Sequence, residues 1–138
     1  LLPYRLKVGH KMKQQQTKSC KVHDLKMIIY KIFRRPEWEA FRDKGESFGA
    51  PIDLVDGYIH FSTAVQLAET AAKHFTKESD LVLLALDAGH LGTALKWEPS
   101  RGGQLFPHLY RHLKRQDVLW DKSLPLGTAG HIFPEGLW

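Results

Sequence analysis

Three polar side chains alternate along one short stretch of the sequence. Tyr58, His60 and Ser62 occupy every second position, and Ile59 and Phe61 lie between them. In a strand, such alternation places the polar residues on one face and the apolar residues on the face that packs against a core. A titratable imidazole beside a hydroxyl and a phenol is suited to acid–base chemistry or to binding a polar ligand. The spacing therefore predicts a strand with one chemically equipped face.

A helix is expected to begin directly after this strand, because Thr63 and Gln66 have the S/T-x-x-E/Q spacing of a capping box. The start of a helix presents unpaired N–H groups and the positive end of its dipole, which favour an anion. His60, Ser62 and Thr63 would then border a phosphate or carboxylate site. The alternative is structural: Thr63 only caps the helix, Ser62 turns the chain, and His60 is hydrogen-bonded in the wall of the fold.

A second polar cluster follows later in the chain and strengthens the first interpretation. Arg101 precedes Gly102 and Gly103, so its guanidinium, suited to two-pronged binding of phosphate or carboxylate, stands beside a flexible backbone. Three ring-bearing side chains share one face of the strand predicted next: Phe106, His108 and Tyr110. Alone, this stretch is compatible with a surface hairpin loop. Together, the two clusters predict a pocket for a phosphorylated, ring-bearing ligand.

The basic charge of the chain is concentrated at its beginning. The 138 residues have a net charge of +5, of which residues 1–26 contribute +6, so residues 27–138 carry −1. A domain that binds nucleic acid usually has a basic face of its own. Nucleic acid is therefore not an expected partner, and the predicted partner is a small nucleotide or phosphorylated molecule.

We predict a flexible, basic extension over residues 1–26 and a single domain over residues 27–138. The composition, 43% hydrophobic and 25% charged, is typical of a globular domain. No apolar run reaches the length of a membrane span, and the first residues lack the apolar region of a secretory signal. The single Cys20 cannot form an internal disulfide. These features together predict a cytoplasmic protein.

Hydrophobic patterning predicts an alternation of short strands with two helices. Residues 47–55 are expected to form a loop, and His74 is expected to be a solvated residue on the second helix. The helices are predicted at residues 36–45 and 63–75. The strands are predicted at residues 27–33, 58–62, 81–86, 95–97, 106–110, 118–120 and 131–133.

These motifs resemble a known family of bacterial proteins, the domain of unknown function 952 family. The resemblance covers roughly residues 27–138 and is carried by four stretches: residues 30–32 (YKI), 56–63 (DGYIHFST), 97–103 (WEPSRGG) and 106–110 (FPHLY). It implies an α+β fold of the ADP-ribosylation type, with a split, mainly antiparallel sheet and a few helices. This fold is related to ADP-ribosyltransferases and RNA 2′-phosphotransferases.

The resemblance also implies roles for individual residues. In those transferases a His-x-Ser/Thr motif contacts the ribose and amide of NAD, and His60 and Ser62 stand at that spacing. A late glutamate activates a ribose hydroxyl, and Glu98 is the candidate for this role although Pro99 follows it. An oxocarbenium-like centre at the ribose would also need nearby negative charge, which Glu98 or Asp56 would supply. In a phosphotransferase-like variant, the substitutes for that glutamate would be Arg101, His108 and Tyr110.

Two functions follow from these observations, and whether the protein is an enzyme stays open between them. The first is a transferase acting on NAD or ADP-ribose-type nucleotides, with NAD as cofactor, no metal, and His60, Glu98 and His108 as catalytic residues. The alternative is a non-catalytic module that binds a nucleotide or phosphometabolite. The cofactor-binding residues are predicted to be the same in both cases: Tyr58, His60, Ser62, Thr63, Arg101 and Tyr110. A third interpretation is a small interaction domain whose basic extension contacts a partner.

Overall fold

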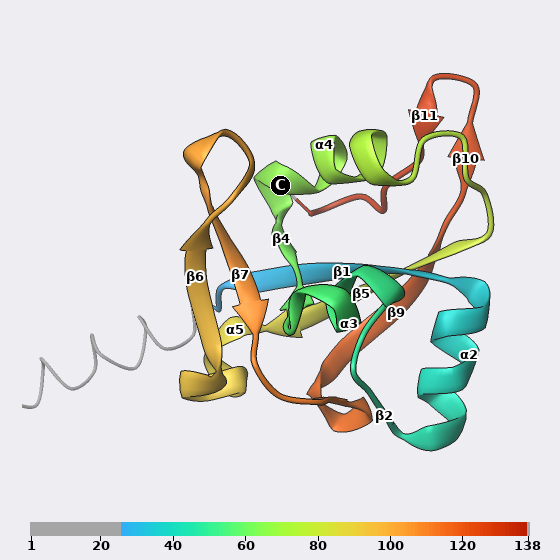
Figure 1. Cartoon of the computed structure of the whole chain (residues 1–138). Helices are drawn as coiled ribbons and strands as arrows, with labels where there is room; N and C mark the ends of the chain where they lie inside the picture. Colours follow the sequence, from blue (N-terminus) through green and yellow to red (C-terminus); the bar gives the residue numbers. More distant parts are fainter. Residues whose placement is uncertain (1–25, 138) are drawn as a thin grey trace, which may run out of the picture.

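Two antiparallel sheets organise the part of the chain that the structure, a computed structural model, describes: residues 26–137 (Figure 1). The larger sheet has the order β4-β1-β5-β9, with β1 at Ile28–Arg34, β4 at Ser62–Thr63, β5 at Leu81–Asp87 and β9 at Val118–Leu124. The smaller sheet has the order β3-β7-β6, with β3 at Ile59–His60, β6 at Leu95–Pro99 and β7 at Leu105–Leu109. Two short pairs complete the strands: β2 (Glu46–Ser47) with β8 (Leu113–Lys114), and β10 (Leu126–Gly127) with β11 (Gly130–His131). The predicted α+β class with mainly antiparallel strands is confirmed.

The strands β1 and β5 form the centre of the larger sheet. They pair over seven residues, from Ile28 opposite Asp87 to Arg34 opposite Leu81. Residues 81–86 are all buried, because apolar side chains pack against both faces of β5. In β1 one charged residue, Lys31, is buried among the apolar ones. Both strands were predicted from their continuous apolar runs.

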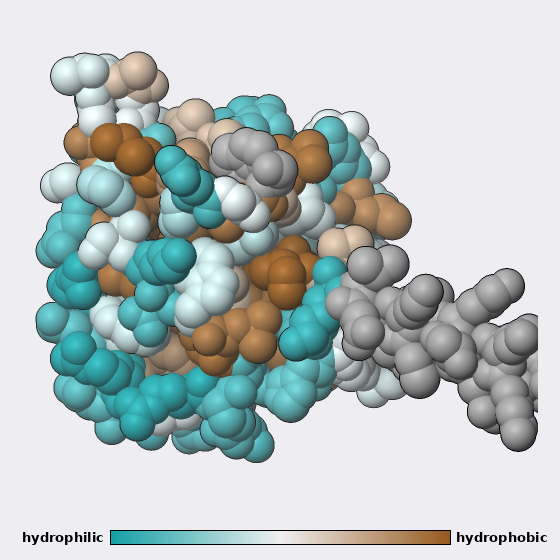
Figure 2. Space-filling view, turned by 180° about the vertical axis from the view of Figure 1, so that it is seen from behind, coloured by the Kyte–Doolittle hydropathy of each residue, from teal (hydrophilic) through white to brown (hydrophobic). Residues whose placement is uncertain are grey.

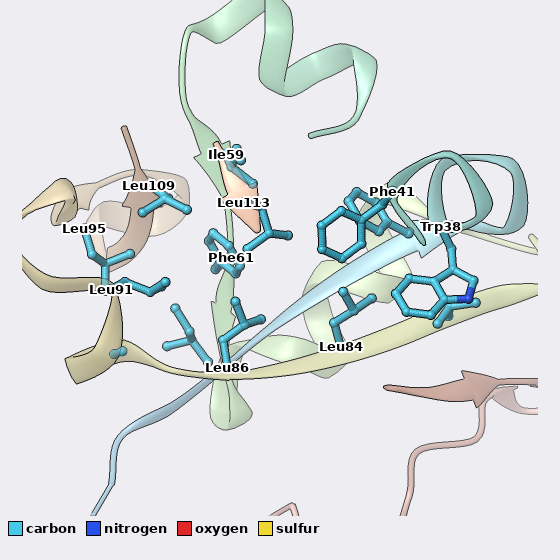
Figure 3. Close-up of a cluster of buried hydrophobic side chains, with 14 residues drawn as sticks. Trp38, Phe41, Ile59, Phe61, Leu84, Leu86, Leu91, Leu95, Leu109 and Leu113 are labelled. Carbon is cyan, nitrogen blue, oxygen red and sulfur yellow. The ribbon is translucent and has the colours of Figure 1, made fainter. Parts of the chain in front are cut away.

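A cluster of buried side chains joins the two sheets and helix α2 (Figure 3). In this view Leu84 of β5 lies beneath Phe41 of α2, and Leu86 lies beneath Phe61 and Leu113. A second cluster lies on the other face of the larger sheet and packs under helix α4. Seen from behind, hydrophobic residues reach the surface in several patches separated by hydrophilic ones (Figure 2).

Two helices begin and end where the sequence signals predict. Helix α2 (Arg35–Lys44) buries Trp38 and Phe41 and ends at Gly45, which has a positive φ of 80°. Helix α4 (Ala64–His74) starts with a capping box, in which Thr63 Oγ1 accepts from the backbone N–H of Gln66 at 3.2 Å. The Gln66 side chain in turn accepts from the backbone N–H of Thr63 at 3.0 Å. The capping prediction is confirmed.

The prediction of a loop at residues 47–55 is wrong, because these residues include helix α3 (Pro51–Asp56). Pro51 starts the helix, and the Asp53 carboxylate accepts from the backbone N–H of Ala50 at 2.7 Å. Gly57, with φ at 88°, ends it. Asp53 is the buried residue of α3, whereas the apolar side chains of this helix are exposed. Without an apolar face, the helix gives no hydrophobic periodicity.

The strand predicted at residues 58–62 is divided, because β3 and β4 belong to different sheets. The remaining segments differ from the predictions mainly at their ends. Strand β9 continues to Leu124 rather than ending at residue 120, and β11 begins one residue early and ends at His131. Short helical turns complete the chain: α5 (Ala88–Leu91), η1 (Gly92–Ala94), η2 (Arg101–Gly103) and η3 (Arg115–Asp117). The extension predicted at residues 1–26 lies outside the described residues except for its last position. No helix in the described range is long and apolar enough to cross a membrane.

The loop before α3 offers a test of how tightly Asp53 is enclosed. Gly49 has φ at 102°, and a Cβ there would lie 2.7 Å from the Cβ of Asp53. Gly45 also has a positive φ, but a Cβ there would meet nothing within 4 Å. We expect Gly45→Ala to lower the free energy of unfolding by about 1–2 kcal/mol and Gly49→Ala by about 3 kcal/mol or more. Urea denaturation of both variants measures the difference, and equal losses would contradict the enclosure of Asp53 by this loop.

Candidate functional site

A buried carboxylate, Asp53, connects helix α3 to strands β1 and β3. Its Oδ2 lies 2.6 Å from Lys31 Nζ, and its Oδ1 lies 2.5 Å from His60 Nδ1. Because a carboxylate only accepts hydrogen bonds, the His60 Nδ1 must donate. Burial alone would raise the pKa of Asp53, but the hydrogen bond from His60 and the charge of Lys31 outweigh it and lower the pKa. Asp53 is therefore a charged group that fixes the His60 ring.

The second nitrogen of His60 also has a carboxylate partner. His60 Nε2 lies 3.0 Å from Asp56 Oδ2, at the end of α3. The His60 side chain is 31% exposed, whereas that of Asp53 is fully buried. The imidazole is thus held from both sides, and part of the ring is accessible to a ligand.

A second histidine has a similar arrangement on strand β7. His108 Nδ1 lies 2.7 Å from Glu98 Oε1, which also accepts from the hydroxyl of Tyr110 at 2.8 Å. These two hydrogen bonds lower the pKa of Glu98, and the one from Tyr110 raises the pKa of Tyr110 to about 12. His108 is only 2% exposed, and its Nε2 has no hydrogen-bond partner within residues 26–137. In the neutral ring, donation from Nδ1 to Glu98 leaves the lone pair on Nε2.

The register of two strands brings the two histidines together. β3 pairs with β7 so that His60 stands opposite His108, and their ring centroids are 5.3 Å apart. The ring of Tyr58 stacks on His108 with a centroid distance of 4.2 Å and lies 4.7 Å from His60. The first and second clusters predicted from the sequence therefore meet in one place.

Arg101, in the turn η2, lies against helix α4. One terminal nitrogen donates to Thr70 Oγ1 at 3.0 Å, and the other lies 3.2 Å from His74 Nε2. The hydroxyls of Thr70 and Ser62 are 2.8 Å apart, which links Arg101 to the strand that follows His60. The guanidinium is thus positioned by neutral side chains.

The positive charge of Arg101 has no close carboxylate partner in the described part of the chain. The Glu69 carboxylate lies 4.0 Å from Arg101 Nε and is largely exposed, so this contact contributes little. Arg101 Nε is buried and has no hydrogen-bond partner among residues 26–137. Burial, and then the charge of Arg101, lower the pKa of His74. An anion at this point would satisfy the guanidinium.

These groups line one cavity of about 650 Å³, called here the larger cavity. The predicted site residues on its wall are His60, Ser62, Arg101 and His108. Asp56 also lines it, and apolar side chains such as Phe75 complete the wall. A concave site of this size with a few convergent polar groups is typical of small-molecule binding.

The other predicted site residues lie elsewhere. Tyr58 and Tyr110 line a second cavity of about 330 Å³, called here the smaller cavity. Thr63 caps α4 and does not line either cavity, and Glu98 holds His108 without lining either. A direct ligand contact by Thr63 or Glu98 stays a prediction.

Sequence reasoning missed four residues of the site: Lys31, Asp53, Thr70 and His74. His74 is exposed as expected, yet it lines the larger cavity and contacts Arg101. A signal for Lys31 was present, because a charge inside a strand that is apolar on both faces requires a buried partner. That partner, Asp53, is 22 positions away and was assigned to a loop.

The role of Thr63 can be separated from ligand binding. Because its hydroxyl caps α4, we expect Thr63→Ala to lower the free energy of unfolding by about 1 kcal/mol. Ligand affinity should stay unchanged in this variant, since Thr63 does not line either cavity. Denaturation and binding measurements on the same sample check both, and an affinity loss without a stability loss would restore the predicted contact.

The described residues contain no group of three or more His, Cys, Asp and Glu side chains that could hold a metal ion. The site is a cavity of an α+β domain, lined by polar and apolar side chains. The chain belongs to the family described as "Protein of unknown function (DUF952)", whose model matches residues 32–121, including His60, Arg101 and His108.

Solved structures of one relative agree with this membership. The crystal structure of protein CC0527 from Caulobacter crescentus has a sequence that is 49% identical to this one. The match covers 75% of this chain and 91% of the CC0527 chain, with a TM-score of 0.73. For the solution NMR structure of CC0527, the sequence identity is 48% and the TM-score is 0.69. This match covers 76% of this chain and 90% of the CC0527 chain. No curated protein matches the sequence.

Proposed function

We propose that this chain binds a nucleotide of the NAD or ADP-ribose type in the larger cavity and acts on it as a transferase. One observation carries the proposal: His60, fixed by two carboxylates, lines the same cavity as Arg101, whose charge has no close acidic partner in residues 26–137. Arg101 would bind the phosphates, and His60 and Ser62 would contact the ribose hydroxyls. A cytoplasmic location, where such nucleotides occur, is part of the proposal.

The chemistry would be substitution at the ribose carbon that bears nicotinamide. The bond to nicotinamide breaks, with its electron pair leaving on the ring nitrogen, and a water or acceptor hydroxyl forms the new bond to the carbon. The incoming hydroxyl loses its proton, and His108 Nε2 has the lone pair to accept it. The positive charge that develops on the ribose needs a nearby negative group.

Asp56 is the better candidate for that negative group than Glu98. Asp56 lines the larger cavity and is partly exposed, whereas Glu98 is hydrogen-bonded to His108 and Tyr110 and lines neither cavity. In this proposal Asp56 therefore supplies the negative charge beside the ribose, which Glu98, outside the cavity wall, does not supply. Glu98 acts through His108, as a positioning residue.

The alternative is a non-catalytic binding module for a nucleotide or phosphometabolite. The engagement of Asp56 by His60 favours it, because the carboxylate then orients the ring and does not face a ribose directly. The same cavity and the same Arg101 contact would serve this function.

Nicotinamide release from NAD distinguishes the two functions. For the transferase, we expect release by the wild-type protein, and Asp56→Asn should retain NAD binding while release falls at least tenfold. Asp43→Asn, a carboxylate on α2 outside both cavities, is the matched control and should leave release unchanged. Binding without release would support the binding module, and the absence of binding would overturn both.

The role of Glu98 predicts a particular tautomer of His108. Because Nδ1 donates to Glu98, ¹⁵N NMR should show a protonated Nδ1 and an unprotonated Nε2 in the wild-type protein. Glu98→Ala should shift His108 toward the Nε2-protonated form, whereas Tyr110→Phe should leave the tautomer unchanged because Glu98 remains. An Nε2-protonated ring in the wild-type protein would contradict the assignment of His108 as a proton acceptor.

A further inference from the structure

We propose that the smaller cavity is a subsite for an aromatic ring that carries no negative charge, such as the nicotinamide or adenine of the nucleotide. This inference rests on the proposed function for the identity of the ligand. The cavity of about 330 Å³ lies beside the end of α3 and the turn that follows β7. Four ring-bearing side chains line it: Phe48, Tyr58, Tyr110 and His112. Its volume suits one ring system rather than a whole dinucleotide.

The rings that line the smaller cavity contact one another in pairs. Phe48 meets the His112 ring edge-on, with a centroid distance of 3.8 Å, and Tyr58 lies 5.3 Å from Tyr110. Phe48 is nevertheless 57% exposed and Tyr110 is 42% exposed. Aromatic side chains stabilise one another and a bound ring through offset and edge contacts. A planar ligand would cover the exposed aromatic surface.

The charges of this cavity select against a phosphate. Arg111 forms hydrogen bonds to both carboxylate oxygens of Asp117, at 2.9 and 3.2 Å, so its charge is neutralised. His112 Nδ1 lies 3.3 Å from Glu46. Arg101, in the larger cavity, has no such partner in the described range. The two cavities therefore differ in chemistry: the larger one suits an anion and the smaller one a ring without negative charge.

Two residues place the cavities side by side. Asp53 lines both of them, and the Tyr58 ring on the wall of the smaller cavity stacks on His108, which lines the larger one. A ligand with a ring and a phosphate at opposite ends would contact both sides of this wall. The ring subsite would thus orient the bond next to His60 and His108.

Fragments test the subsite without the whole nucleotide. The probes are nicotinamide and adenine, which carry no phosphate, and inorganic pyrophosphate, which carries no ring. We expect NMR titration with a ring fragment to shift resonances of Phe48, Tyr110 and His112, and pyrophosphate to shift those of Arg101 and His74. Phe48→Ala should weaken binding of the ring fragment about tenfold, because it removes an aromatic face on which the ring stacks. Ile132→Ala, at a similarly exposed apolar residue outside both cavities, should not.

The outcomes separate the subsite from the proposed function. Ring-fragment shifts confined to the surroundings of Arg101, or no shifts from either fragment at millimolar concentration, would overturn the subsite. Ring binding at Phe48 without any pyrophosphate binding would support the subsite and count against the nucleotide function.

Discussion

Replacing Asp53 with alanine is expected to destabilise the protein by about 3–5 kcal/mol, because the substitution leaves the Lys31 charge buried without a partner. The side chains of Asp53 and Lys31 are 0% and 6% exposed, so water cannot replace the lost contact. The same change removes the carboxylate oxygen that orients the His60 ring. It also removes the oxygen that accepts from the backbone N–H of Ala50 at the start of helix α3. Urea denaturation, with the midpoint and slope fitted together, measures the loss.

A double variant separates the stability of this network from its function. Replacing both members with apolar residues, as in Lys31→Met with Asp53→Leu, should recover much of the stability, because neither charge is then buried alone. Ligand binding should not recover, since His60 has lost its fixed orientation. A loss below about 1 kcal/mol in Asp53→Ala would contradict a buried, charge-paired network.

The pKa of Asp53 gives this contribution a pH dependence. Its pKa in the folded protein is lowered, and an unfolded aspartate titrates near about 3.9. The stabilisation is therefore complete above the unfolded value and is lost as the pH falls through the folded one. Unfolding measured between neutral pH and acid should show this loss in the wild-type protein and a weaker one in the double variant.

Replacing Arg101 with methionine is expected to weaken ADP-ribose binding about 10- to 100-fold, since hydrogen bonds to a charged group contribute about 1.5–3 kcal/mol. The guanidinium is held by the neutral side chains of Thr70 and His74, so its removal breaks no ion pair closer than the 4.0 Å contact with Glu69. Stability should therefore change far less than affinity. Methionine retains apolar contact with Phe106, over whose ring the guanidinium lies.

A matched control distinguishes this site from a general charge effect. Lys122→Met removes one positive charge from β9, outside both cavities, and should leave affinity unchanged. Because phosphate binding to Arg101 is charge-assisted, the wild-type affinity should also fall as salt increases. Equal affinities of the wild-type protein and Arg101→Met would place the phosphate elsewhere.

Local signals in the sequence predicted much of the frame and part of the site. The capping box at Thr63 is formed as its spacing predicts, and the apolar runs of β1 and β5 lie in the core. The alternation of residues 58–62 predicted less well which way each side chain points. Strand β3 covers only Ile59 and His60, and Ser62 belongs to β4 in the other sheet. Tyr58 lies outside β3, so period-2 alternation does not determine which way its side chain points. It lines the smaller cavity.

Contacts between distant residues account for what the sequence did not reveal. Lys31 meets Asp53 across 22 positions, and Arg101 meets Thr70 across 31. Such pairings depend on how the strands align, and neither composition nor local spacing specifies that alignment. Helix α3 was not predicted for a different reason. It buries a carboxylate and not a stripe of apolar side chains, so its sequence has no hydrophobic periodicity.

The most direct measurement is calorimetric titration of ADP-ribose into the wild-type protein and His60→Ala, with circular dichroism to verify that the variant is folded. We expect saturable binding of one ADP-ribose by the wild-type protein. We also expect a large loss of affinity in folded His60→Ala. Failure of the wild-type protein to bind millimolar ADP-ribose, or equal binding by both proteins, would contradict the assignment of the larger cavity as a nucleotide site.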